Sequence, residues 1–457
     1  MLIAAVVMLT SCAKSEPAGK FTGAKGEVKI ITLDPGHFHA ALIQKVMFDQ
    51  ISPTVHVYGP DGPDVADHLN RIKGFNTRSE NPTTWKEVTY TGDDFLEKML
   101  AEKPGNAVVI SGNNKKKTKY IKACVDAGLN VLADKPMCIT PEDFDLLKEA
   151  FASAKKNGVF IYDIMTERSS ITTILQKELS LDKGVFGNQQ VGTVDDPAVI
   201  SESVHHFFKY VAGNPIKRPK WYFDTTQQGE GIVDVTVHLT DLIMWAAFPD
   251  KIIDYTKDIE ILEAERWPTL ITLDQYKKVT HLDIDAFPDF LQGSVNADGV
   301  LECYGNGAIT YKLNGIVAQA KVEWRYQAPA GTKDTHFALM RGSKCDLVIR
   351  QGKEQNFKPE LYVEAATGQD AGELEAALKT AVEGLQSEWT GVAVVKEGDL
   401  LHVTVPDKYR IGHEAHFGQV TERFLQYLVD GKLPEWEVPN MTAKYYTTTT
   451  ALQMAGK

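Results

Sequence analysis

The sequence predicts an α/β protein in two parts: an N-terminal parallel sheet covered by helices on both faces, and a C-terminal α+β domain with a large, mostly antiparallel open sheet. Up to about residue 165, short apolar runs alternate with amphipathic stretches, which is typical of strands joined by helices in a parallel sheet. Beyond that point, β-branched and aromatic residues alternate in segments broken by Gly, Asn and Asp. A chain of 457 residues also exceeds one ordinary hydrophobic core, which favours two domains.

The first twelve residues, MLIAAVVMLTSC, form an apolar run that is too short to span a bilayer as a helix. A polar linker over 13–27 follows, which is typical of the region after a signal peptide. The ending Leu-Thr-Ser-Cys resembles a bacterial lipobox, in which the cysteine carries the lipid. We therefore expect an exported bacterial lipoprotein, anchored to a membrane through Cys12 and facing the periplasm or the cell surface. A buried N-terminal strand is the weaker alternative.

The first domain is expected over 28–165, and its elements alternate between strand and helix. The apolar runs at 28–33, 54–59, 106–112, 130–136 and 158–165 predict buried strands. Helical periodicity predicts helices over 40–51, 93–102, 119–128 and 142–158.

The second domain is expected over 166–457. Alternating patterns predict strands over 281–287, 299–313, 319–328 and 345–352. The stretch 360–405 reads strand, helix, strand, strand, and this order indicates a possible α/β insertion within the domain. A last helix is expected over 414–431, followed by a C-terminal tail.

Charge and cysteine usage exclude several classes of function. The formal net charge is −12, and no stripe of Lys and Arg interleaves with aromatic residues, so nucleic acid is not an expected partner. The four cysteines beyond Cys12 show no metal-binding spacing, and they form either disulfides or buried free thiols: Cys124, Cys138, Cys303 and Cys345.

A second group of potential ligands lies near the C-terminus. His413, Glu414 and His416 do not have HExxH spacing and lack an evident third ligand. We therefore expect no metal site.

The turn after the first strand, residues 34–40 (DPGHFHA), is where a dinucleotide-binding fold holds the diphosphate. Only Gly36 of a GxGxxG pattern is present, because Asp34 and His39 stand at the spacing of the outer glycines. A coenzyme site would use Asp34, Gly36, His37 and His39, with the two histidines as hydrogen-bond donors. An ordinary strand-to-helix turn is the alternative.

A candidate ribose contact follows the second strand. Asp61 stands where an acidic residue would accept hydrogen bonds from the ribose hydroxyls. An exposed turn aspartate is an equally good interpretation.

Residues 106–137 (NAVVISGNNKKKTKYIKACVDAGLNVLADKPM) resemble a segment of Gfo/Idh/MocA oxidoreductases, the family of glucose-fructose oxidoreductase and inositol dehydrogenase. In that family a strand, an Asn-containing turn, a helix and a second strand lead to Glu-Lys-Pro, which here is Asp134-Lys135-Pro136. The resemblance implies a Rossmann-like first domain that binds NAD or NADP, with NAD favoured. It places Ser111, Gly112 and Asn113 along the cofactor, beside the Asp134-Lys135-Pro136 motif.

The resemblance also assigns roles to individual residues of the motif. Pro136 is expected to follow a cis peptide, and Lys135 is expected to face the nicotinamide and the reacting hydroxyl. A solvated lysine at a strand end is the alternative. Many relatives carry a histidine where this chain has Lys117, so that contact is not assigned.

Residues 229–245 (GEGIVDVTVHLTDLIMW) resemble the family's helix in which Asp and His, four residues apart, face the substrate. These residues are Asp234 and His238. The resemblance implies that His238 is the general base, that Asp234 fixes its tautomer, and that Lys135 stabilises the developing alkoxide. Helical spacing also places Asp241 one turn later, where it would orient the imidazole. A buried histidine satisfied by a neighbouring carboxylate is the alternative.

The expected substrate is a sugar or glycoside oxidised at a ring hydroxyl, because export suggests a carbohydrate. Aromatic rings beside polar groups suit a sugar face. Candidate contacts, which are equally compatible with ordinary packing, are His205, His206, Tyr210 and Trp221. Family members often dimerise through the open sheet, which implies a homo-oligomer. Export implies a retained cofactor, since free NAD is not expected outside the cytoplasm.

Two other functions fit the same residues. One is NAD-dependent glycoside cleavage by transient oxidation and elimination. The other is a non-catalytic carbohydrate-binding lipoprotein on the same fold, which the depleted glycine turn would favour.

Overall fold

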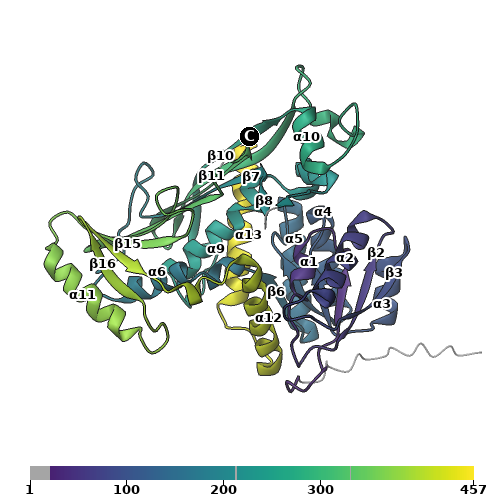
Figure 1. Ribbon diagram of the computed structural model, residues 1–457, viewed down its shortest axis with the longest axis horizontal. Helices are drawn as coiled ribbons and strands as arrows, with labels where there is room; N and C mark the ends of the chain where they lie inside the picture. The colour runs from purple at the N-terminus through teal and green to yellow at the C-terminus, as the bar shows by residue number, and fades with distance from the viewer. Residues whose placement is uncertain (1–20, 212–213, 330, 457) are drawn as a thin grey trace, which may run out of the picture.

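The computed structural model describes residues 21–211, 214–329 and 331–456. Its first domain contains a six-stranded parallel sheet with the order β3-β2-β1-β4-β5-β6 (Figure 1). The strands are β1 (Ile30–Leu33), β2 (Thr54–Gly59), β3 (Lys86–Thr91), β4 (Ala107–Ile110), β5 (Asn130–Asp134) and β6 (Ile161–Ile164). The helices are α1 (His39–Leu42), α2 (Pro63–Thr77), α3 (Phe95–Glu102), α4 (Asn114–Asp126) and α5 (Pro141–Asn157).

Both faces of this sheet are buried, as expected for parallel strands. Ile31 and Val108 point into one core with side chains of α3, α4 and α5. Ile30 and Val109 point into the opposite core. That second core is completed by α12 (His413–Asp430), through Phe417, Val420, Phe424, Leu425 and Leu428. A helix from the end of the chain therefore covers the first sheet (Figure 1).

The second domain contains a nine-stranded sheet with the order β10-β11-β12-β7-β13-β14-β15-β17-β16. Only the β12–β7 pair is parallel, so the sheet is mostly antiparallel and the predicted fold class is confirmed. Its strands are β7 (Val199–Phe208), β10 (Ile259–Ile271), β11 (Leu301–Leu313), β12 (Ile316–Gln327), β13 (Thr335–Arg341), β14 (Cys345–Gln351), β15 (Glu360–Ala365), β16 (Ala393–Glu397) and β17 (Leu400–Thr404).

Helices and short elements complete this domain. The helices are α6 (Ile171–Leu181), α7 (Thr225–Gln228), α8 (Gly231–Asp234), α9 (Thr236–Ala247), α10 (Leu273–Thr280), α11 (Ala371–Gly384) and α13 (Glu437–Ala455). The 3-10 turns are η1 (Thr166–Ser169), η2 (Lys220–Phe223), η3 (Asp289–Ser294) and η4 (Asp407–Tyr409), and a small hairpin joins β8 (Tyr210–Val211) to β9 (Asn214–Pro215). The stretch 360–405 does form strand, helix, strand, strand, and its strands extend the large sheet beyond β14.

Three expected elements differ from the structure. The helix over 40–51 is reduced to the four residues of α1, because Ile51 returns to the sheet and forms a bridge with Val28. The strand over 281–287 is an irregular segment whose alternating Leu282 and Ile284 pack against the core without strand pairing. The expected tail contains the 19-residue helix α13.

Two further observations concern the cysteines and the membrane. Cys124, Cys138, Cys303 and Cys345 are buried free thiols. Among the helices of the described residues, none combines the length and the apolar character that crossing a membrane requires. Cys12 and the expected signal peptide lie outside the described residues.

Candidate active site

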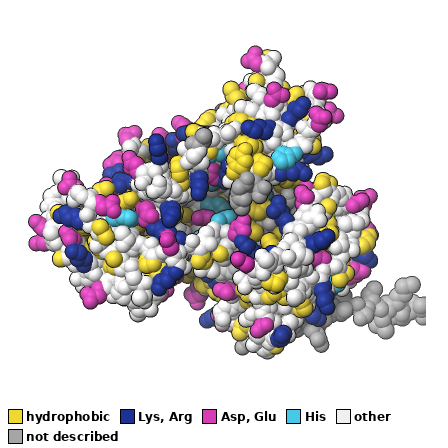
Figure 2. All heavy atoms as spheres, viewed as in Figure 1, with side chains coloured by type: hydrophobic (Ala, Val, Ile, Leu, Met, Phe, Trp, Pro, Cys, Tyr) yellow, Lys and Arg dark blue, Asp and Glu magenta, His cyan; other side chains and the backbone are white. Residues whose placement is uncertain are grey.

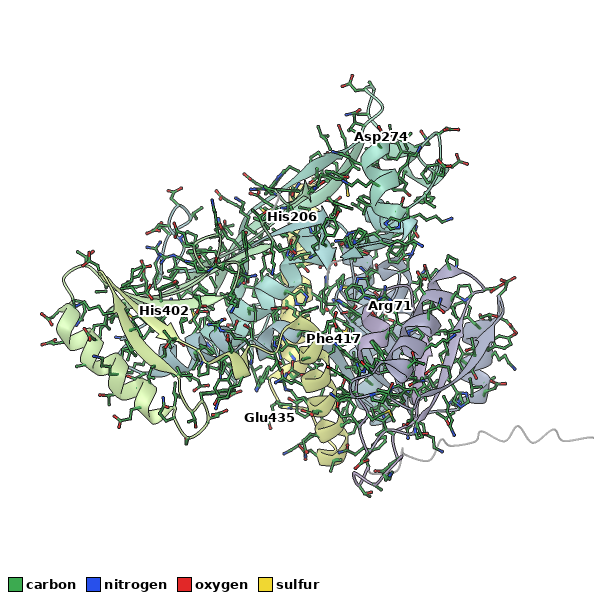
Figure 3. The ribbon with its side chains drawn as sticks, viewed as in Figure 1. Arg71, His206, Asp274, His402, Phe417 and Glu435 are labelled. Atoms are coloured by element: carbon green, nitrogen blue, oxygen red, sulfur yellow. The ribbon has the colours of Figure 1, made fainter. Side chains whose placement is uncertain are left out.

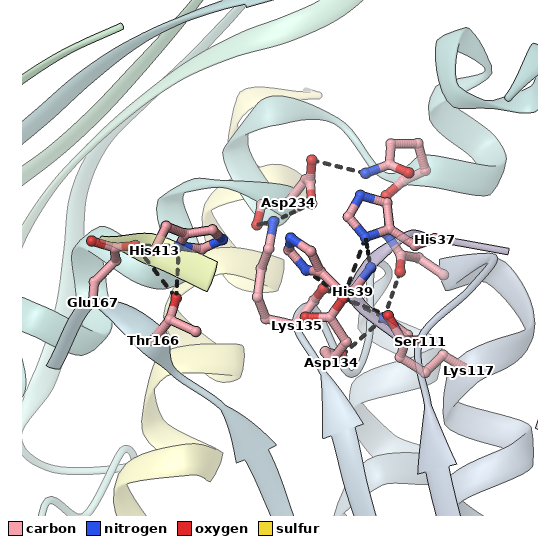
Figure 4. A network of polar contacts seen from close by, with 12 residues as sticks. His37, His39, Ser111, Lys117, Asp134, Lys135, Thr166, Glu167, Asp234 and His413 are labelled. Carbon is pink, nitrogen blue, oxygen red and sulfur yellow. Dashed lines mark hydrogen bonds and ion pairs between the residues drawn. The ribbon is translucent and has the colours of Figure 1, made fainter. Parts of the chain in front are cut away.

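The carboxyl ends of β1, β4 and β5 face the second domain across a hollow in which histidine side chains are visible (Figure 2). Ligands of open parallel sheets bind at this edge, because the turns after neighbouring strands converge there. Two motifs that lie 99 residues apart in sequence meet at this point, since Lys135 Nζ donates to Asp234 Oδ1 at 2.8 Å (Figure 4).

Lys135 follows β5, and its peptide bond to Pro136 is cis, as the family resemblance implies. The Lys135 side chain is 13% exposed and the Asp234 side chain 6%, so their ion pair is largely withdrawn from water. Gln228 Nε2 donates to the other carboxylate oxygen of Asp234 at 3.0 Å. The amine is therefore held at the edge of the cleft by a carboxylate that is itself fixed.

His238 does not share a continuous helix with Asp234. The helix is interrupted at Val235, so Asp234 ends α8 and His238 lies in the first turn of α9. Neither Asp234 nor Asp241 is hydrogen-bonded to the imidazole, and His238 Nδ1 has no hydrogen-bond partner among the described residues. Burial, followed by the charge of Lys135, lowers the pKa of His238 to about 3, so the imidazole is neutral near pH 7.

The role expected of Asp241 is wrong. Its carboxylate accepts hydrogen bonds from Arg168 Nε and Nη2, both at 2.6 Å, and from Lys444 Nζ at 2.7 Å. All three residues are buried. Asp241 is therefore held by two cations from distant parts of the chain, and it does not orient His238.

The turn after β1 carries a compact polar cluster (Figure 4). Asp134 Oδ2 lies 2.9 Å from His39 Nδ1 and 3.7 Å from His37 Nδ1, and it accepts a hydrogen bond from Ser111 Oγ at 2.9 Å. Burial lowers the pKa of both histidines, so they are neutral near pH 7. Burial acts to raise the pKa of Asp134, but His39 and Lys117 outweigh it and hold that pKa well below its usual value.

Lys117 and Asp34 occupy the base of this turn. Lys117 Nζ donates to Asn114 Oδ1 at 2.6 Å and to the Asp134 carbonyl at 2.9 Å, and burial lowers its pKa to about 8. Asp34 was expected to contact the cofactor, but its carboxylate accepts from Tyr120 at 2.9 Å and Lys116 at 3.3 Å, both on α4. These two contacts fix the Asp34 side chain against α4, and its role as a cofactor contact stays a prediction.

Two glycines bring the backbone close together at this edge. A Cβ on Gly112 would lie 2.2 Å from the Asp34 carbonyl oxygen, so only glycine fits there. A Cβ on Gly36 would meet Asp64 Oδ2 and Trp221 Cζ2, each at 3.3 Å. Asn113 caps α4 and donates to Gln227, which links the cofactor edge to the second domain.

A cavity of about 410 Å³ adjoins this turn. The first domain contributes Pro35–Phe38 and the start of α2, and the second domain contributes Ile216–Tyr222, a segment we call the strap. Trp221 of the strap donates to Asp64 Oδ2 at 3.2 Å. Arg71, on the first domain, also lines the cavity (Figure 3).

The chemical types of these residues suit the adenosine and diphosphate portions of a dinucleotide. The turn after β1 and the start of α2 are where such a cofactor lies, and an acidic side chain, Asp64, is available there for a ribose. Asp64 was not predicted, because it stands three residues beyond Asp61, which is exposed in the structure. The helix after this turn, α1, has only four residues, and His37 lines the cavity beside its start.

The expected substrate residues are divided between two environments. His205 lies in β7, stacks on Trp324 and lies 3.5 Å from Asp334, and His206 Nδ1 lies 2.9 Å from the same carboxylate. His206 lies in β7 of the large sheet (Figure 3). Tyr210 is 66% exposed, so nothing encloses it.

One further acid/base pair was not predicted. His413 Nδ1, at the start of α12, lies 3.2 Å from Glu167 Oε1 in η1, and the His413 ring lies 5.5 Å from the ring of His39 (Figure 4). Burial acts to raise the pKa of Glu167, but His413 holds it below its usual value. The two residues are 246 positions apart, and no sequence signal connects them, although His413 was considered above as a metal ligand.

Comparisons with known proteins agree with this geometry. Residues 63–162 match the family model "Oxidoreductase family, NAD-binding Rossmann fold", and residues 175–456 match "Putative oxidoreductase C terminal domain". A crystal structure of a "putative oxidoreductase" from Parabacteroides merdae is 59% identical, with a TM-score of 0.93 over 96% of this chain and 99% of that one. No curated protein matches the chain.

More distant structures share the fold. Levoglucosan dehydrogenase in complex with NADH is 12% identical, with a TM-score of 0.58 over 94% of this chain and 97% of that one. Biliverdin reductase from Synechocystis sp. PCC 6803, in complex with biliverdin and NADP+, is also 12% identical, with a TM-score of 0.57 over 94% of this chain and 99% of that one. With its Rossmann-like domain, the cis Lys135-Pro136 motif and both family models matched, the chain belongs to the Gfo/Idh/MocA family of NAD(P)-binding oxidoreductases.

Proposed function

We propose that the protein oxidises or reduces a ring hydroxyl or ketone of a sugar or glycoside with a retained NAD or NADP, of which NAD is favoured. The observation that carries this proposal is the buried ion pair of Lys135 and Asp234 beside the neutral His238, at the carboxyl end of β5. Relatives of this fold include levoglucosan dehydrogenase, solved in complex with NADH and L-sorbose, which supports a sugar as the substrate class.

The chain's own residues would provide proton handling and charge stabilisation. A neutral His238 can accept the hydroxyl proton, because its free Nδ1 is not engaged by another group. Lys135 would stabilise negative charge on the substrate oxygen, and Asp234 would hold the amine in place. The nicotinamide, when bound, accepts or supplies the hydride.

The test is a substrate screen on purified mature protein. We would denature one portion to quantify nicotinamide dinucleotide per chain, and mix another portion with a panel of sugars and glycosides while following absorbance at 340 nm. A retained dinucleotide that is reduced by at least one sugar is the expected result. A protein that neither retains nor binds NAD or NADP would be a carbohydrate-binding lipoprotein at most, and the proposal would be rejected.

Glycoside cleavage by transient oxidation and elimination is a second candidate. It is favoured by the Glu167–His413 pair, because elimination needs a base next to the transient ketone and an acid at the departing oxygen. Release of p-nitrophenol from a nitrophenyl glycoside, with incorporation of solvent deuterium beside the oxidised carbon, would identify this reaction. Simple accumulation of the keto-sugar without release would identify the first.

The cellular setting is proposed from the N-terminal sequence. Lipidation of Cys12 would hold the protein on a membrane in the periplasm or at the cell surface. A homo-oligomer formed through the nine-stranded sheet is also proposed, because family members often dimerise through this sheet.

A further inference from the structure

We propose that the turn after β1 holds a divalent transition-metal ion, bound by His37, His39 and Asp134. The three potential ligand atoms, two Nδ1 atoms and Asp134 Oδ2, lie within 4.8 Å of one another. They come from the turn after β1 and the end of β5, two neighbouring regions of one rigid sheet edge. The proposal concerns this cluster alone and does not depend on the reaction proposed above.

The spacing of the ligand atoms suits a tetrahedral ion. Zinc bonds of roughly 2.0–2.2 Å place neighbouring ligand atoms about 3.3–3.6 Å apart. The Asp134 carboxylate oxygen lies 2.9 Å from His39 Nδ1, below that range, and 3.7 Å from His37 Nδ1, above it. Small side-chain rotations would therefore form the site without moving the backbone.

The hydrogen bonds around the cluster show which ligand atoms face one another. The backbone N–H of His39 donates to His37 Nδ1 at 3.4 Å, so this nitrogen presents its lone pair. The same nitrogen faces the Asp134 oxygen at 3.7 Å, which leaves two acceptors facing each other. A metal ion would take the His37 lone pair in place of this long backbone contact, bind the Asp134 oxygen, and replace the proton between His39 and Asp134. Ser111, which donates to Asp134, would orient the carboxylate as an outer partner.

The charges around the cluster favour an anion as the fourth ligand of the metal ion. Lys117 is bonded to the Asp134 carbonyl, and Lys135 is paired with Asp234. These two lysines balance the two aspartates, so a divalent ion would bring an excess of positive charge. An anionic group, such as hydroxide or a phosphate oxygen, would fill the open position from the adjoining cavity that His37 lines. Two imidazoles and one carboxylate with an open position form a ligand set that zinc and iron(II) use.

Cobalt(II) is the probe for this site, because its absorption reports ligand geometry. The full mature protein would be stripped with EDTA, dialysed and titrated with Co²⁺, with zinc quantified in a parallel sample. We expect one Co²⁺ per chain with tetrahedral visible absorption. His37→Ala and His39→Ala should each weaken binding by about 100-fold or more, and Ser111→Ala by about 10- to 100-fold.

His402→Ala is the matched control, since this histidine is also ion-paired but lies at the far side of the second domain (Figure 3). It should bind Co²⁺ as the parent does. His37 is partly exposed, so its variant should fold, as circular dichroism would verify. Failure of the parent to bind one equivalent, or unchanged binding in both His37→Ala and His39→Ala, would overturn the proposal. NAD binding measured on the EDTA-treated protein keeps this outcome separate from the proposed reaction.

Discussion

Lys135 illustrates how much of the site a short motif can indicate. Its place after a buried strand and before a proline pointed to the cleft, and its partner Asp234 came from a second motif. The partners of Asp34 and Asp241 could not be predicted in the same way. Tyr120 lies 86 residues from Asp34, and Arg168 lies 73 residues from Asp241. Helical spacing shows which side chains share a helix face. Tertiary packing decides which charged residues from elsewhere in the chain contact that face.

Lys135→Met should lower the rate of the chemical step by about two to four orders of magnitude, because it removes the charge that we propose faces the reacting oxygen. Stability should also fall, since Asp234 keeps a buried charge without its lysine. Single-turnover kinetics would measure the first effect and urea unfolding the second. Lys98→Met, which removes a surface ion pair with Glu102, should change neither. Parent-like turnover by the Lys135 variant would refute the assignment.

His68 predicts how stability depends on pH. It is 3% exposed, both ring nitrogens lack hydrogen-bond partners among the described residues, and burial lowers its pKa to about 4. Between pH 6.5 and 4 the unfolded chain therefore binds a proton that the folded protein excludes, and the free energy of unfolding falls as the pH falls.

For His68→Gln, the loss of unfolding free energy between pH 7 and pH 5 should be about 2 kcal/mol smaller than in the parent. Urea unfolding at the two pH values measures it. His281→Asn, at an exposed histidine, should keep the parental loss. Equal pH dependence in the parent and the His68 variant would contradict this account.

Among the elements, α13 joins the two domains through a buried ionic network. Lys444 Nζ donates to Asp163 of β6 and to Asp241 of α9, and Arg168 bridges Asp241 and Glu437. Burial raises the pKa of Glu437. This helix was not predicted because it is buried on most sides, so its apolar residues form no stripe, and a run of four threonines disfavours helix.

Lys444→Met should destabilise the protein by about 3–5 kcal/mol, because it leaves two buried carboxylates short of a cation. The shift in the urea midpoint measures this loss. Lys379→Met, which breaks an exposed i, i+4 pair on α11, should cost at most about 0.5 kcal/mol. Similar losses in the two variants would mean that the network contributes little.

The strap over Ile216–Tyr222 lines the cavity, and its Trp221 donates a hydrogen bond to Asp64 of the first domain. Trp221→Ala should reduce the amount of dinucleotide that copurifies with the protein and should speed its dissociation by about 10-fold or more, since a bulky aromatic contact is lost. Nucleotide per chain after gel filtration is the measurement. Trp389→Ala, at a remote tryptophan, should retain the parental amount.

Regular elements were predicted where local pattern and packing agree. The strands β1, β4, β5 and β6 are fully buried and rich in apolar residues, so their sequence signal is strong. The expected helix over 40–51 failed because sheet pairing of Ile51 overrides its local periodicity. In the segment 281–287, the alternation of apolar and polar residues predicted a strand. The apolar residues instead pack an irregular segment against the core.

At the scale of the whole molecule, the fold class and the family were predicted. The packing of the last helices, α12 and α13, against the first domain was not. The last helices contribute His413 to the cleft and Lys444 to the ionic network, and neither carries a sequence signal for that contact. Such contacts depend on the relative placement of domains, which no local pattern records.

Cys12→Ser should release the protein from the membrane fraction of the cells that make it, because acyl-chain burial would supply the anchoring free energy. Immunoblots of membrane and soluble fractions are the measurement. Ser11→Ala, which retains the cysteine, is the control and should remain in the membrane fraction. Membrane association unchanged in the Cys12 variant would exclude the lipid anchor.

Completion of the first sheet by α12 has a consequence for the order of folding. Ile30 and Val109 share their core with first-domain side chains such as Leu42 and with Phe417 and Val420, which are made only after more than 400 residues have been synthesised. The nascent N-terminal half therefore lacks part of its apolar cover, and loop closure over such a separation is slow. Stable folding should be post-translational, with the halves acquiring resistance to proteolysis together, and a nascent chain of this kind would depend on chaperones until its last helices emerge.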